Sequence, residues 1–321
     1  MVPSDPRPGQ NNADFVERPA LYIGPVIDCH HHLWDLSMGR HPWLAEGGMT
    51  ALGDLSYLRH DYLPADFASD ATGTGVVASV CVEALWDSPN GPMEEIAWFD
   101  SLDRPAGVAG RYVAKADLAA PDVEIQLERL AAHPRVAGVR QTIRWHPDPV
   151  RRMSDRILTD DPAWLAGVGR LQAHGLVLEL LVYPWQAQAV FDIAQSNPDL
   201  PIVVNHCSSP IDRDEAGIAR WKNGLGTMAR VPNVHLKLSN FAKYSAGGTI
   251  QGARDFIGPC ILAFGASRCL WGSDYPVARS TLPYRDTLKL FREAIGDRPA
   301  GEQQAMLFGN TARLYRMDVA T

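Results

Sequence analysis

The 321-residue sequence predicts an α/β fold of the (β/α)8 class, a TIM barrel, on three observations. Eight short apolar runs recur along the chain, and most are apolar almost throughout, as strands buried on both faces are. Amphipathic stretches separate several of these runs, which indicates helices alternating with the strands of a parallel sheet. No glycine-rich nucleotide loop follows the first run, which argues against the main alternative, an open doubly wound sheet.

The expected elements follow one another in a simple order. The strands are expected at residues 26–30, 75–84, 110–118, 136–143, 176–182, 201–206, 233–239 and 269–275. Helices are clearest at residues 121–133, 161–175 and 186–198. The second of these helices starts after an acidic cap and ends at a glycine, and the third ends at a proline, as helix boundaries often do. Residues 1–20 are polar and proline-rich, so we expect a flexible arm before a single barrel domain over residues 21–321.

Composition excludes several classes of function. A hydrophobic fraction of 46% and a charged fraction of 21% are typical of a soluble globular protein. The formal net charge of −7 gives no electrostatic reason to expect nucleic acid or an anionic membrane as a partner. The five cysteines form no CxxC pair and lie mostly in apolar runs, which predicts buried free thiols in a reducing compartment. Without an apolar signal segment or a membrane span, we expect a cytoplasmic protein, and the sequence leaves homo-oligomerisation open.

Three consecutive histidines close the first expected strand, in the stretch VIDCHHHLWD at residues 26–35. Strand alternation places Asp28, His30 and His32 on one face and His31 on the other. A polar face inside a protein needs partners, and a divalent metal is a common partner of clustered histidines. His30 and His32 are therefore candidate ligands, whereas His31 is expected to be structural.

Polar side chains also stand at the carboxyl ends of the other expected strands, where the active sites of such barrels lie. The set comprises His30, His32, Glu83, Lys115, Asp117, Arg140, Gln141, Glu179, Asn205, His206, Lys237, Ser239 and Asp274. A lone buried histidine is usually a satisfied core residue. The His-x-His on the first strand nevertheless favours a functional role for His206, so we expect one polar site at the barrel mouth.

Several charged residues have a structural alternative. Glu83 and Glu179 lie in apolar surroundings, where an unpaired carboxylate is costly. Glu179 either serves the site or forms a salt bridge to Arg140. Lys237 either faces the substrate or pairs with Asp117 inside the barrel mouth.

These residues resemble the amidohydrolase-related family of TIM-barrel hydrolases (amidohydrolase family 2), and within it the branch of sugar-acid and muconolactone-type lactonases. The resemblance covers residues 25–316 and rests on the stretches VIDCHHHLWD, HDYLPADF, VAGVRQ, NVHLKLS, WGSDYPV and FGNTARLY. It implies that His30 and His32 meet His206 near the end of the barrel. It also implies that Asp274 is the general base that takes a proton from the attacking water.

The family pattern also bears on metal binding. Arg140 stands where dinuclear members have a lysine, so a carbamylated lysine and a two-metal centre are not expected. Glu179 stands where many metal-binding relatives have a histidine, and some lactonases of the branch work without metal. The expectation is therefore one divalent metal, zinc for preference, or none. The ligands would be His30, His32, His206 and Asp274.

Hydrolysis of a lactone suits this set of residues. Zinc lowers the pKa of bound water from about 16 to about 7, and an aspartate beside that water can accept its proton. Without metal, the three histidines could donate hydrogen bonds to the carbonyl oxygen. A lactone is reactive enough for this weaker arrangement, whereas an unactivated amide is a harder target. We therefore predict an enzyme that hydrolyses ester bonds in lactones.

The substrate is expected to be small and anionic, because fixed cations at a barrel mouth bind carboxylates. The candidate substrate-binding residues are Arg140, Arg144, Lys237, Glu83, Glu179, Trp34 and Tyr244, with Trp145 and Trp185 as further candidate walls. Loop packing is the alternative for the aromatic residues. The predicted substrate is a cyclic ester with a carboxylate or several hydroxyls. The rival functions are a metal-dependent decarboxylase or hydratase on the same scaffold, and a barrel that binds an acid without turnover.

Overall fold

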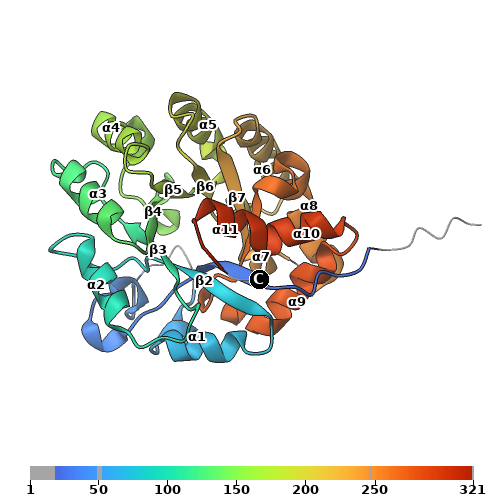
Figure 1. The fold of residues 1–321 in the computed structure, drawn as a ribbon. Coiled ribbons are helices and arrows are strands. Elements are labelled where there is room, and N and C mark those ends of the chain that lie inside the picture. The colour runs from blue at the N-terminus through green and yellow to red at the C-terminus, as the bar shows by residue number, and fades with distance from the viewer. Residues whose placement is uncertain (1–18, 49–52, 246–247, 320–321) are drawn as a thin grey trace, which may run out of the picture.

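The eight strands form one parallel sheet in which the strands pair in chain order, from β1 to β8 (Figure 1). The computed structural model describes residues 19–48, 53–245 and 248–319. The strands are β1 Val26–His31, β2 Val76–Val82, β3 Arg111–Lys115, β4 Val136–Thr142, β5 Val177–Leu181, β6 Ile202–Val204, β7 Val234–Ser239 and β8 Cys269–Gly272. Their side chains are almost all buried, as the apolar runs predicted.

Backbone hydrogen bonds between β1 and the residues after β8 close the sheet into a barrel. The N–H of Asp274 donates to the carbonyl of His30 at 2.8 Å, and the N–H of His32 donates to the carbonyl of Tyr275 at 2.8 Å. The predicted (β/α)8 class is confirmed. The same bonds place Asp274 beside both histidines of the His-x-His pair, so closure of the barrel also assembles part of the site.

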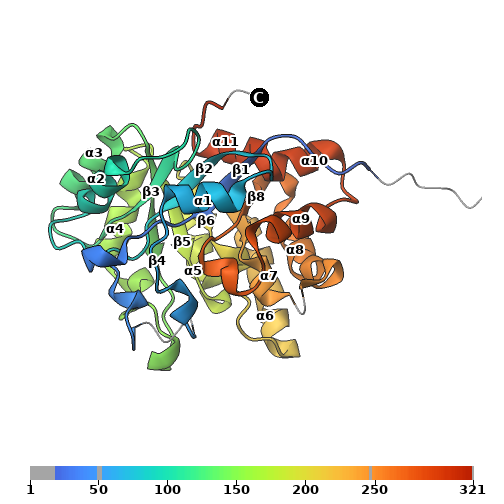
Figure 2. The same ribbon diagram turned by 90° about the horizontal axis from the view of Figure 1, so that it is seen from below.

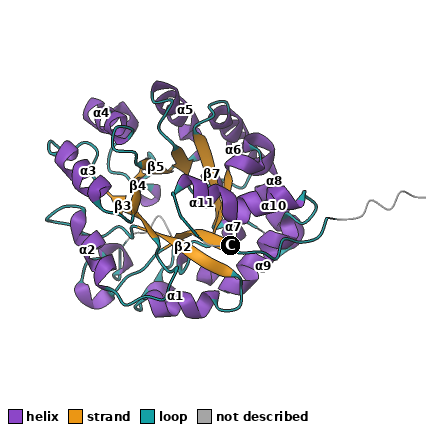
Figure 3. Cartoon of the chain, in the orientation of Figure 1, coloured by secondary structure: helices purple, strands orange, loops and turns teal. Residues whose placement is uncertain are grey.

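Helices surround the strands (Figure 3). They are α1 Pro64–Ala71, α2 Met93–Ser101, α3 Val123–Ala132, α4 Pro162–Leu171, α5 Ala187–Ser196, α6 Glu215–Ala229, α7 Phe241–Tyr244, α8 Ile250–Phe264, α9 Tyr284–Ala294, α10 Ala300–Gln304 and α11 Asn310–Leu314. The three helices expected from the sequence are α3, α4 and α5. Helix α4 begins where predicted, because the carboxylate of Asp161 accepts the N–H of Ala163 at 2.9 Å.

The two ends of the barrel differ. Figure 2 shows α10 and α11 at one end and the segments that follow β1 and β4 at the other. Tyr315, directly after α11, extends into the barrel, where its hydroxyl donates to Glu179 Oε1 at 2.5 Å. The chain therefore fills the amino-terminal end of the barrel, and the carboxyl-terminal end is left for the site.

Two strands end earlier than the apolar runs predicted. Strand β6 ends at Val204 and β8 at Gly272, so His206 and Asp274 lie in the turns that follow. Both residues adopt positive φ angles, 53° for His206 and 59° for Asp274, which are incompatible with an extended strand. The turns aim these side chains at the barrel mouth.

Three further predictions concern the cysteines, membrane-spanning helices and the amino-terminal arm. All five cysteines are free and buried, as expected. Among the described residues, no helix has the length and apolar character that crossing a membrane requires. Most of the arm expected at residues 1–20 lies outside the described residues, which begin at residue 19.

Candidate active site

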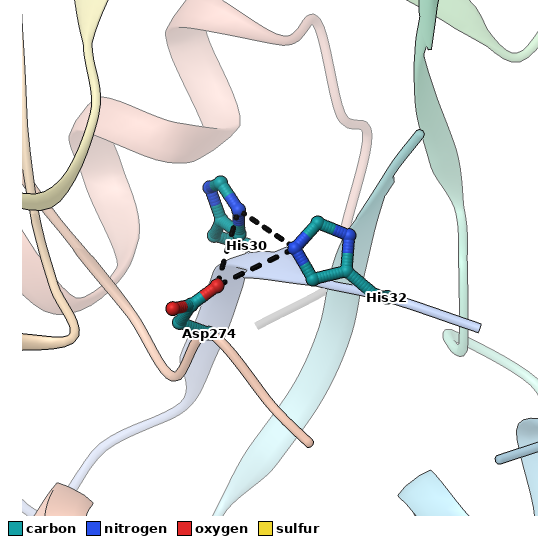
Figure 4. A group of neighbouring side chains, drawn as sticks. All are labelled: His30, His32 and Asp274. Carbon is teal, nitrogen blue, oxygen red and sulfur yellow. Dashed lines mark hydrogen bonds and ion pairs between the residues drawn. The ribbon is translucent and has the colours of Figure 1, made fainter. Parts of the chain in front are cut away.

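The His-x-His pair and Asp274 form a tight triangle (Figure 4). Nε2 of His30 lies 3.3 Å from Nε2 of His32, and Asp274 Oδ1 lies 3.5 Å and 3.4 Å from these two atoms. Ligands bound to zinc at about 2.0–2.1 Å in a tetrahedron are about 3.3 Å apart. The three donor atoms therefore fit a single divalent metal, and together they form a candidate metal site.

His206 joins this triangle from the turn after β6. Its Nε2 lies 3.8 Å from Asp274 Oδ1, and its ring centre lies 4.7 Å from that of His30. Its Nδ1 lies 2.8 Å from the hydroxyl of Ser239 at the end of β7, which orients the ring. The structure thus brings together the four residues that the sequence singled out.

Backbone strain accompanies the site. His206 begins a run of four non-glycine residues with positive φ that ends at Ser209, and Asp274 is a further residue of this kind. Such conformations cost on the order of 1–3 kcal/mol each and persist where the surrounding structure requires them. The strain is concentrated in the two turns that present His206 and Asp274.

The protonation states suit ligands and a base. Burial, and the cationic side chains nearby, lower the pKa of His30 well below its ordinary value and that of His206 to about 3. Burial alone would raise the pKa of Asp274, but His206, His32 and Arg140 lower it below its ordinary value. Both imidazoles are therefore neutral at pH 7, and Asp274 is a carboxylate.

A cavity of about 360 Å³ opens over this group. Its lining includes His32, Arg140, Thr142, Arg144, Tyr183, His206, Asn240, Lys243, Tyr244 and Asp274. His30 is not part of the lining and is fully buried beneath it. His32, His206 and Asp274 can therefore meet a ligand, whereas His30 reaches it through its neighbours.

The salt bridge of Glu179 to Arg140, one of the two alternatives for Glu179, is wrong, because Arg140 binds Glu83 instead. Nε of Arg140 donates to Glu83 Oε1 at 2.6 Å, and Nη2 donates to the Glu83 carbonyl at 2.6 Å. Arg140 and Glu179 are register partners on the adjacent strands β4 and β5. In a tilted barrel, however, side chains that share a layer come from alternate strands, here the ends of β2 and β4.

The same layering corrects the alternative partner of Lys237. Its Nζ lies 2.7 Å from both carboxylate oxygens of Glu179, which comes from the alternate strand β5, and it does not pair with Asp117. Both side chains are 0% exposed and lie outside the cavity lining. Neither Lys237 nor Glu179 can therefore contact a substrate in this cavity directly, as the sequence had predicted that they would.

Arg144 is the cation best placed for a ligand. It is buried in the cavity wall, and among the described residues its guanidinium group contacts neutral partners only. It donates to the carbonyl of Val182 at 3.3 Å, the sulfur of Met153 at 3.3 Å and the hydroxyl of Ser209, and the ring of Tyr183 and the hydroxyl of Tyr244 lie beside it. A buried guanidinium that faces a cavity and forms no ion pair with the described acidic residues is a natural partner for a carboxylate.

The predicted aromatic walls divide into three groups. Tyr244 lines the cavity. Trp34 is fully buried, donates from its indole N–H to the His60 carbonyl at 2.8 Å and lies outside the lining. Trp145 and Trp185 border a separate surface hollow. Loop packing is thus the role that the geometry supports for Trp34.

Several residues that line the cavity were not predicted from the sequence. Lys243 and Asn240 follow β7, Thr142 ends β4, and Tyr183 follows β5. The side-chain oxygens of Asn240 and Thr142 are buried without a hydrogen-bond partner. Their positions at or after strand ends could have indicated that they line the cavity. Each of these residue types is also common in ordinary loops, so the indication is weak.

The fold and site define a class of barrel enzyme with a His-x-His pair on the first strand and an aspartate after the last. The sequence model of the family described as Amidohydrolase matches residues 27–317, and this chain belongs to that family. The predicted resemblance is confirmed, and so is the prediction of a hydrolase of this superfamily.

Curated relatives match over nearly their whole length. An L-fucono-1,5-lactonase from Burkholderia ambifaria is 28% identical over 302 residues, which cover 91% of this chain and 96% of the relative. An uncharacterized protein of Sinorhizobium fredii, y4mH, is 29% identical over 294 residues, which cover 91% of this chain and 98% of that protein. The matched regions therefore extend over the barrel and its site.

Solved structures share the architecture. An amidohydrolase from Burkholderia multivorans, solved with bound HEPES and with bound zinc, is 25% identical with TM-scores of 0.76 and 0.74. The match covers 92% of this chain and 100% of that one. A 5-carboxyvanillate decarboxylase from Sphingomonas paucimobilis, 14% identical with a TM-score of 0.61 and coverage of 92% and 99%, shares the fold alone.

Proposed function

We propose that this chain is a lactonase that opens a small lactone bearing a carboxylate or several hydroxyls. The observation that carries the proposal is the position of Asp274, a carboxylate at the floor of a cavity, between His32 and His206. The lactonase relatives support the same reaction class.

Asp274 is the general base in this proposal. A water on the cavity floor would give its proton to the carboxylate, attack the carbonyl carbon, and leave Asp274 able to return the proton to the departing alkoxide. His206 and His32 face the same space, and their Nε2 atoms lie 3.8 Å and 3.4 Å from Asp274 Oδ1. The base and the two histidines therefore line the same cavity, in which the lactone would lie.

A metal suits the donor atoms, as their spacing indicates. The proposed ligands are His30, His32 and Asp274, with His206 beside them. When bound, a divalent metal would act as a Lewis acid toward the carbonyl group, and the zinc-bound Burkholderia multivorans amidohydrolase favours zinc.

The cations on the cavity wall select the substrate. Arg144 would bind a carboxylate of the lactone, since its hydrogen bonds among the described residues go to neutral groups and it forms no ion pair there. Lys243 and Arg140 add further positive charge to the cavity lining. The unpartnered oxygens of Asn240 and Thr142 would bind hydroxyl groups.

A lactone panel tests the proposal. Aldonolactones, muconolactones and lactones of sugar diacids are incubated with the wild-type chain and with Asp274→Asn, and acid release and product mass are measured. Addition of one water, absent with the variant, is expected. Loss of carbon dioxide from acid substrates, or loss or addition of water at a carbon–carbon bond, would favour the rival decarboxylase or hydratase. Binding of an acid without turnover would favour a non-catalytic barrel.

A further inference from the structure

A buried polar network lies directly beneath the His-x-His pair. Lys237 on β7 is 0% exposed and has three neighbours for its ammonium group. Two are the carboxylate oxygens of Glu179, each at 2.7 Å, and the third is Nδ1 of His30 at 3.3 Å. A lysine has three N–H donors and no acceptor, so these contacts use all of them.

The partners of Glu179 show that it is the negative member of the pair. Its Oε1 accepts the hydroxyl of Tyr315 at 2.5 Å, and its Oε2 accepts the amide N–H of Asn205 at 2.8 Å. Both oxygens also accept from Lys237. A carboxylate surrounded by donors carries no proton of its own, so the balancing positive charge belongs to Lys237.

The position of Lys237 determines which nitrogen of His30 carries a proton. An ammonium can only donate, so Nδ1 of His30 must accept. A neutral imidazole has a single N–H, which therefore lies on Nε2. That atom faces Asp274 Oδ1 at 3.5 Å and Nε2 of His32 at 3.3 Å.

His32 has the opposite arrangement. Its Nδ1 lies 2.9 Å from the carbonyl oxygen of Val82, which can only accept, so the proton of His32 is on Nδ1 and its Nε2 has a free lone pair. Both groups that face Nε2 of His30 are thus acceptors, and the Nε2–H of His30 donates to Nε2 of His32 at 3.3 Å.

We propose that Lys237 is a positioning residue that holds His30 as the Nε2–H tautomer. In this form the Nε2–H of His30 donates to Nε2 of His32 at 3.3 Å and faces Asp274 Oδ1 at 3.5 Å. The same proton occupies the Nε2 atom that a metal would bind, so metal binding at His30 requires the proton to leave. His32 needs no such change, because a backbone carbonyl fixes its Nδ1–H, the usual support of a metal-binding histidine.

The tautomer can be read without substrate. Nitrogen-15 NMR of the histidine-labelled wild-type chain should show His30 protonated on Nε2 and bare on Nδ1, and His32 protonated on Nδ1. A His30→Gln sample assigns the signals. A wild-type spectrum with His30 protonated on Nδ1, or on both nitrogens at pH 7, overturns the proposal.

A double variant tests the effect on metal affinity. Lys237→Met together with Glu179→Gln removes both charges, so neither is left buried and unpaired. The Nδ1 signal of His30 should shift while that of His32 stays in place. Zinc should bind at least about tenfold more tightly, since Nδ1 is then free to take the proton. Unchanged or weaker zinc affinity, measured by calorimetric titration, contradicts the proposal.

The proposed role of Lys237 rests on the proposed lactonase function only where it concerns the turnover of a lactone. Neither the spectra nor the zinc titration uses a lactone. Failure of the lactone panel would therefore leave the role of Lys237 intact, and failure of the zinc test would leave the lactonase proposal intact.

Discussion

Two buried ion pairs lie inside this barrel, and they differ in whether they reach the cavity. Arg140 and Glu83 form the upper pair, and Arg140 lines the cavity. Lys237 and Glu179 form the lower pair, which is fully buried beneath His30. Each pair joins alternate strands, so the layering of the barrel produced both.

The difference between the pairs lies in spare hydrogen-bond donors. The contacts of Arg140 with Glu83 use two of the five N–H groups of its guanidinium, so others remain for a ligand. Lys237 has no N–H left after Glu179 and His30. The upper pair is therefore suited to recognition and the lower pair to positioning, although each is a buried cation beside a buried carboxylate.

The largest effect is expected on kcat, from a substitution of a residue that faces the cavity. Asp274→Asn should lower kcat by on the order of 10²–10⁴-fold, because the amide cannot accept the proton of water. Steady-state kinetics measures the loss, and circular dichroism of the same sample checks that the fold is retained. A folded variant with near wild-type turnover would remove Asp274 from the role of base.

The lower pair should respond mainly in stability. Lys237→Met alone leaves the Glu179 carboxylate buried without its cation, which is expected to cost about 3–5 kcal/mol. Thermal unfolding measures the loss, and the double variant with Glu179→Gln should recover most of it. If the single and double variants unfold at the same temperature, the two charges are not coupled as described.

A smaller effect is expected for Arg144, the cation in the cavity wall that is proposed to bind the substrate. Arg144→Met should raise KM for a carboxylate-bearing lactone by about 10–100-fold, the value of a hydrogen bond to a charged group. KM for a neutral lactone with the same ring is the matched control and should change little. An equal rise for both lactones would mean that Arg144 shapes the cavity and does not bind a carboxylate.

The smallest effect concerns a second carboxyl group behind the upper pair. Glu95 on α2 is buried and accepts the N–H of Ala84 at 2.9 Å. Burial, with repulsion from Glu83, raises the pKa of Glu95 from 4.5 to about 8. The folded chain keeps this proton while the unfolded chain releases it, so the contribution of Glu95 to stability falls as the pH rises from about 4.5 to about 8.

Replacing Glu95 by its neutral isostere, glutamine, tests this predicted fall in stability with rising pH. Glu95→Gln should stabilise the protein by at least about 1 kcal/mol at pH 9 and by less at pH 5, as read from melting temperatures across the pH range. A difference for Glu95→Gln that does not depend on pH would contradict the raised pKa.

Strand periodicity predicted the barrel and a set of polar residues at its mouth, and the family resemblance singled out His30, His32, His206 and Asp274 from that set. Alternation places the first two on one face, and parallel strands deliver their carboxyl ends to one mouth. The partners of the charged residues could not be predicted in this way. Arg140 and Glu179 are neighbours in register, yet the tilt of the strands sends their side chains to different partners.

The sequence by itself determined the fold class, the family and the identity of the acid and imidazole groups at the mouth, because these depend on local pattern and on the order of the strands. Only the tertiary structure decided which groups face the cavity and which lie beneath it. Burial, strand tilt and the turns at His206 and Asp274 are properties of the closed barrel, in which residues far apart in the chain share one layer.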